Sequence, residues 1–169
     1  MNSLLERVRA VLSTTPERWQ RLVSTLPLDV LTRPPAAEEW SALNCLQHLL
    51  DAERLLFPVR LRAFLAGQDL DDFDPQKAHA EADSQTPEQL AAAFIHARKE
   101  SLVLLEDVQD DDLKRTVQHP KLGTVTLAEM LHTWAAHDLM HTVQAERALM
   151  QPFLLGSGGW RPFFQDHEI

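Results

Sequence analysis

The chain contains a single cysteine, Cys45, no tyrosine and only five glycines among its 169 residues. One cysteine cannot form an internal disulfide, so we expect a reducing cytoplasm as its compartment. Basic residues are also few: the chain has 16 Lys and Arg but 25 Asp and Glu, which gives a formal net charge of −9. A nucleic-acid surface requires a basic stripe, so this balance argues against nucleic acid as a partner.

Long hydrophobic runs are missing as well. A membrane span requires about 20 consecutive apolar residues, and no run in the chain approaches that length. The first twelve residues, MNSLLERVRAVL, carry charges where a signal peptide would have its apolar region. We therefore expect no membrane segment and no membrane partner. Hydrophobic residues make up 44% of the chain and charged residues 24%, which is typical of a globular domain.

Polar caps followed by apolar residues at helical spacing predict the helices. The first begins at Ser3, whose spacing to Glu6 matches a capping box. A second stretch is expected to start at Thr15, with Pro16 in its first turn, and to end near Leu26. Three further helices are predicted. One covers residues 41–67, where Pro58 could bend it and Gly67 caps it. The others run from residue 86 to about residue 108 and from a capping box at Thr126 to about residue 150.

The segments between these helices differ in length. Residues 68–85 are acidic and form a long middle connection, whereas residues 115–125 predict a small hairpin-like loop. After residue 150 the prolines and glycines argue against further regular helix, so residues 151–169 are predicted to be an irregular tail. The sequence therefore predicts an all-α fold, a four-helix bundle over residues 1–150 with one long middle connection and an irregular C-terminal tail.

Two histidines on the last predicted helix are the first candidate site. His137 and His141 lie four residues apart, so their side chains leave the helix on the same side. That side also carries Met130 and Trp134, which indicates that both rings are buried. Two neutral imidazoles at this spacing can share a metal ion, and ordinary hydrogen bonds in a polar core are the alternative.

A third ligand would have to come from another helix. His48 lies at the edge of the apolar arc of the helix that starts at Ser41, which makes it a candidate that faces inward. His132 lies about 140° from His137 around their common helix and cannot share the site. His79 and His119 fall in predicted loops.

An ordered set of residues in these two helices supports the same three histidines. The set comprises Trp40, Ser41, His48, Asp51 and Glu53, then the segment 123–129, and finally His137, Asp138 and His141. It resembles the DinB-like (DinB/YfiT-like) family of four-helix metalloproteins, over roughly residues 12–148. The resemblance implies that His48, His137 and His141 bind a divalent metal ion, nickel or zinc. Asn44 departs from the pattern, since the family often has an acidic residue there, and the tail is not part of the pattern.

Three neutral nitrogen ligands leave a coordination position open, as in catalytic rather than structural sites. Such an ion can activate a water for hydrolysis or hold a thiolate for group transfer, and the sequence does not choose between them. The resemblance implies a thiol S-transferase that uses a low-molecular-weight thiol, or a hydrolase, acting on a small molecule. The alternative is a non-catalytic stress-related or interaction protein that forms a homodimer through Ala136, Leu139, Met140 and Val143.

Several neighbours could assist the site. Glu53 lies in an apolar arc and needs a buried partner, which is either a structural hydrogen bond, for example to Trp40, or a ligand histidine. Asp138 has the same two interpretations, and Gln144 could bond a bound water or lie on the surface. Asp51 is expected to be solvated and Cys45 to be a buried, inert thiol. Trp134, Met130 and Leu55 are expected to pack in the core rather than line a substrate pocket.

Overall fold

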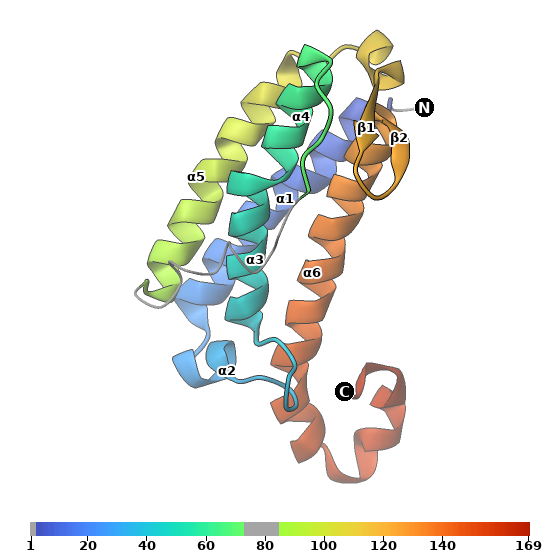
Figure 1. Ribbon diagram of the computed structural model, residues 1–169. Coiled ribbons are helices and arrows are strands. Elements are labelled where there is room, and N and C mark those ends of the chain that lie inside the picture. The colour runs from blue at the N-terminus through green and yellow to red at the C-terminus, as the bar shows by residue number, and fades with distance from the viewer. Residues whose placement is uncertain (1–2, 73–84) are drawn as a thin grey trace.

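The computed structural model describes residues 3–72 and 85–169 and shows a bundle of long helices (Figure 1). The long helical segments are α1 (Leu4–Thr25), α3 (Ala42–Leu55) continued by α4 (Phe57–Ala66), α5 (Pro87–Glu106) and α6 (Leu127–Gly156). The short helix α2 (Leu28–Thr32) joins α1 to α3. The predicted all-α, four-helix-bundle fold is confirmed. Most of the long middle connection, residues 73–84, lies outside the described residues.

The bundle is closed at one end by a small hairpin. A 3-10 helix (Asp110–Lys114) follows α5, and β1 (Thr116–His119) then pairs antiparallel with β2 (Gly123–Thr126). Gly123 has a positive φ of 75°, a conformation that glycine adopts without strain. The hairpin predicted between the last two helices is therefore confirmed, and it delivers the chain to the N-cap of α6 at Thr126.

Helix α1 is continuous, so the predicted restart at Thr15 is wrong. Pro16 lies inside the helix and has no N–H, which leaves the carbonyl of Leu12 without its usual donor four residues later. The Nη1 of Arg98 on α5 donates to that carbonyl at 2.8 Å. The helix therefore passes through the proline because a neighbouring helix supplies the missing hydrogen bond.

Helix α6 continues to Gly156, past the predicted end near residue 150, with Pro152 inside it. The rest of the tail forms a 3-10 helix (Gly158–His167) that folds back beside the end of α6 (Figure 1). Side chains on α6 hold it there. The Nε2 of Gln151 donates to the carbonyl of His167 at 2.8 Å, and Arg147 donates to the carbonyl of Glu168 at 3.1 Å. The expectation of irregular structure from residue 151 onward is thus corrected.

Within residues 3–72 and 85–169, the apolar core falls into two clusters. One includes Leu12, Phe57 and Trp134, and the other includes Trp19 and Phe94. Four charged side chains among the described residues, those of Asp51, Glu53, Arg98 and Asp138, are also buried. In the described part of the chain, no helix is both long and apolar enough to cross a membrane.

Candidate metal centre

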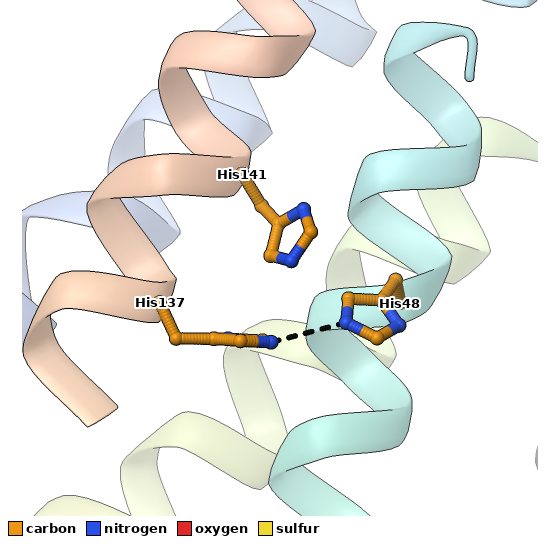
Figure 2. Close-up of side chains that lie close together, drawn as sticks. All are labelled: His48, His137 and His141. Atoms are coloured by element: carbon orange, nitrogen blue, oxygen red, sulfur yellow. Dashed lines mark hydrogen bonds between the residues drawn. The ribbon is translucent and has the colours of Figure 1, made fainter. Parts of the chain in front are cut away.

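Three histidine rings converge between α3 and α6. Figure 2 shows His137 and His141 projecting from α6 toward His48, which projects from α3. The Nε2 atoms of His48 and His137 lie 3.0 Å apart. Each of the three rings offers one nitrogen, and these nitrogens all lie within 4.8 Å of one another. The structure therefore brings together the three histidines that the sequence singled out.

The spacing of the nitrogens can be compared with that of a metal site. Two nitrogens bound to one tetrahedral zinc ion at about 2.1 Å lie about 3.4 Å apart. The separation of 3.0 Å between His48 and His137 is close to that value, and it needs only a small outward movement of the rings. His141 is buried, whereas His48 and His137 are half-buried, so the cluster lies near the edge of the bundle.

The electrostatic environment favours the neutral form of two of these rings, His137 and His141. Burial lowers the pKa of His137 to about 3, and the neighbouring His141, His48 and Arg98 act in the same direction. Burial also lowers the pKa of His141, although the hydrogen bond to Gln144 and the charge of Asp138 oppose it. A neutral imidazole is the form that binds a metal ion, so the site is prepared for one near neutral pH.

Neighbouring side chains orient the rings. The Nδ1 of His141 donates to Oε1 of Gln144 at 2.9 Å, which leaves Nε2 as the nitrogen that faces the cluster. Trp40 stacks on His141 with ring centroids 5.7 Å apart, and Phe57 meets the ring of His137 at 5.2 Å in an edge contact. The sequence suggests that Gln144 either bonds a bound water or lies on the surface. In the structure it contacts the candidate ligand His141 directly.

Glu53 and Asp138 belong to a buried ionic cluster centred on Arg98. The Nη2 of Arg98 lies 2.9 Å from Oε1 of Glu53 and donates to Oδ1 of Asp138 at 2.5 Å. Trp134 Nε1 donates to Glu53 at 2.9 Å, and the hydroxyl of Thr15 donates to Asp138. The buried partner expected for Glu53 is therefore Arg98 with Trp134, not Trp40. Asp138 directly follows His137 in the sequence, so the ionic cluster adjoins the histidine cluster.

Sequence reasoning missed Arg98, and it misjudged two other residues. Asp51 is buried rather than solvated, and it accepts a hydrogen bond from Nε2 of Gln47 at 2.9 Å. Leu55 is 49% exposed and does not pack in the core, in contrast to Met130 and Trp134. Burial raises the pKa of the Cys45 thiol to about 12, which agrees with an inert side chain.

The lowered pKa of His137 predicts an acid-sensitive fold. With metal removed by a chelator, the unfolded chain takes up a proton near pH 6.5, whereas the folded chain does so only near pH 3. Stability should therefore fall as the pH drops from about 6.5 toward 3, because protons then favour the unfolded state. Urea unfolding at a series of pH values should show this slope in the wild type and a shallower one in His137→Gln. His132→Gln, which alters an exposed histidine of the same helix, should keep the full slope; equal slopes in all three proteins would contradict the assignment.

The fold and the histidine cluster define a four-helix bundle with a candidate metal centre between two of its helices. The model of the DinB superfamily matches residues 12–145, and the chain belongs to this superfamily. Among curated proteins, no sequence is similar enough to match the chain.

Solved structures share the fold. YfiT from Bacillus subtilis, described as a probable metal-dependent hydrolase with an unusual four-helix bundle topology, has a TM-score of 0.74 at 20% identity, over 88% of this chain and 87% of its own. The DinB-like protein YjoA from Bacillus subtilis has a TM-score of 0.59 at 16% identity, over 87% of this chain and 92% of its own. A mycothiol-dependent maleylpyruvate isomerase has a TM-score of 0.65 at 14% identity, over 86% of this chain and 63% of its own.

Proposed function

We propose that this protein is a mononuclear metalloprotein in which His48, His137 and His141 hold a divalent ion, nickel or zinc, that acts on a small molecule. The observation that carries the proposal is the convergence of three histidine ring nitrogens within 4.8 Å of one another. Three nitrogen ligands without a charged ligand suit a divalent ion of the zinc or nickel type rather than magnesium or calcium, which prefer oxygen. The chemistry of the donors therefore fits such an ion.

Two reactions are consistent with this site. When bound, the ion would lower the pKa of a water or a thiol in its open position, for hydrolysis or for transfer from a low-molecular-weight thiol. The two structural neighbours described as a probable metal-dependent hydrolase and as a mycothiol-dependent maleylpyruvate isomerase support these two classes. In this chain, Gln144 fixes the ring of His141, while Trp40 and Phe57 cover the cluster with apolar surface.

The alternative is a non-catalytic interaction protein. It is favoured by an exposed apolar face on α6, where Leu139, Met140 and Val143 are 48%, 55% and 56% exposed. Contiguous exposed apolar side chains often mark protein interfaces. We propose this face as the contact of a homodimer, which is compatible with either function.

Metal analysis of the purified protein tests the proposal. We expect about one nickel or zinc ion per chain in the wild type, and loss of the metal in His48→Ala and in His137→Ala without loss of helical circular dichroism. His132→Ala and His96→Ala, which change exposed histidines, should retain it. Metal-loaded protein should then turn over a thiol conjugate or an ester. A stable dimer that binds no metal would favour the non-catalytic alternative.

A further inference from the structure

A cavity lies beside the metal centre, between α4, the hairpin and α6. Its volume is about 370 Å³, within the range of sites that hold small molecules. The apolar part of its wall includes Phe57, Phe64, Leu70, Val125 and Met130. Its polar lining consists of Arg60, His119, the carboxylate Glu129 and the hydroxyls of Thr124 and Thr133. A cavity of this kind suits a molecule with an apolar body and a polar end.

Each of the two ring nitrogens of His119 lies close to an N–H donor. The backbone N–H of Lys121 points at Nδ1 of His119 at 3.1 Å, so this nitrogen must be the acceptor of the ring. A neutral imidazole then carries its proton on Nε2. That nitrogen lies 3.2 Å from Nη2 of Arg60, which is also a donor. Two N–H groups therefore meet at this wall of the cavity, and an oxygen atom placed between them would accept from both.

The nearby carboxylates are already engaged. Asp72 pairs with Nζ of Lys121 at 2.8 Å, and Glu129 accepts from the backbone and the hydroxyl of Thr126 at 2.7 and 2.8 Å. Among the described residues, none supplies a carboxylate that is hydrogen-bonded to Arg60. Burial lowers the pKa of the Arg60 guanidinium, and the charge of Asp72 offsets this only in part. Burial and the charge of Arg60 also lower the pKa of His119, which agrees with a neutral ring.

From this geometry we infer that the cavity binds a small organic acid, whose carboxylate accepts hydrogen bonds from Arg60 and His119. Its apolar body lies against Phe57, Phe64 and Met130. A guanidinium is well suited to this role, because its planar fork matches the two oxygens of a carboxylate.

The position of the cavity connects it to the metal centre. Phe57 lines the cavity and also meets the ring of His137 at 5.2 Å. Thr133, another lining residue, is four residues before His137, so it lies one helical turn away on the same side of α6. The cavity and the histidine cluster thus share the side chain of Phe57. The idea that an organic acid is the substrate of the metal centre rests on the proposed function. The idea that the cavity binds such an acid does not.

Calorimetric titration with phenylacetate tests the inference, with phenylacetamide as the neutral analogue and inorganic phosphate as an anion without an apolar body. We expect phenylacetate to bind at least tenfold more tightly than either. Arg60→Gln and His119→Phe should each weaken phenylacetate binding about tenfold. Arg62→Gln, which removes the same charge from an exposed position of the same helix, should leave binding unchanged. Equal binding of acid and amide, equal effects of the two arginine variants, or phosphate binding as tight as that of phenylacetate would each overturn the inference.

A metal-free protein separates this inference from the proposed function. In His48→Ala, phenylacetate should bind as in the wild type, because Arg60 and His119 are unchanged. Retained binding there, together with loss in Arg60→Gln, supports the acid site even if the wild type proves to hold no metal. Loss of phenylacetate binding in a folded His48→Ala protein would contradict a site built by Arg60 and His119.

Discussion

Replacement of Arg98 by methionine should lower the free energy of unfolding by about 3–5 kcal/mol, the usual cost of removing one partner from a buried ion pair. The guanidinium lies between the carboxylates of Glu53 and Asp138, and the side chains of all three residues are only 1% exposed. Without it, two like charges would remain together in the core. The carbonyl of Leu12 would also lose its donor. Urea unfolding followed by circular dichroism at pH 7 measures the change.

Two further proteins control this experiment. Arg62→Met removes an exposed arginine, and it should change stability by less than about 0.5 kcal/mol. The triple variant Arg98→Met, Glu53→Gln, Asp138→Asn no longer buries like charges, so it should recover part of the loss. If Arg98→Met were as stable as Arg62→Met, the ionic cluster would not hold the helices together.

Addition of nickel or zinc should stabilise the folded protein strongly. Because the three histidines converge only in the folded chain, the ion binds the folded state in preference to the unfolded one. At a free metal concentration of about 1,000 times the dissociation constant, the expected gain is about 4 kcal/mol. Thermal unfolding of chelator-treated protein, with and without added metal, measures this gain as a rise in the midpoint.

The variants make this second experiment specific to the centre. His137→Ala should lose the metal-dependent rise, and His132→Ala, on the exposed side of the same helix, should keep it. Gln144→Ala should keep a reduced rise, since the ring of His141 loses the acceptor that orients it. A similar rise in His137→Ala would place the bound metal elsewhere.

Local signals were sufficient to predict most of the helices. Ser3 and Thr126 form the capping boxes that their spacings predict, and Ser41 and Thr86, at the starts of two other predicted helices, form capping boxes as well. The convergence of His48 with the pair on α6 followed from the apolar arcs of two helices, together with a family resemblance. Helical periodicity fixes which side a residue faces, so the inward positions of His48, His137 and His141 could be predicted from the sequence, although the same reasoning misassigned Asp51 and Leu55 on α3.

Features that depend on contacts between helices could not be predicted in this way. Pro16 has the spacing of a helix start, and only the Arg98 side chain from α5 allows α1 to continue through it. Arg98 itself comes four residues after Phe94, on the buried side of α5, and its charge is complemented by Glu53 and Asp138 on two other helices. A charged residue on the apolar side of each of three helices indicates buried ion pairs, but only the packed structure shows which residues pair.

The bonds made by Arg98 have a consequence for assembly. Through this one side chain, α5 is tied to a carbonyl of α1, a carboxylate of α3 and a carboxylate of α6. A partly formed bundle that lacks any of these helices would leave a buried polar group unsatisfied, so such intermediates are disfavoured. The bundle should therefore fold in a single cooperative step. Since Asp138 adjoins His137, the histidine cluster would be completed in that same step.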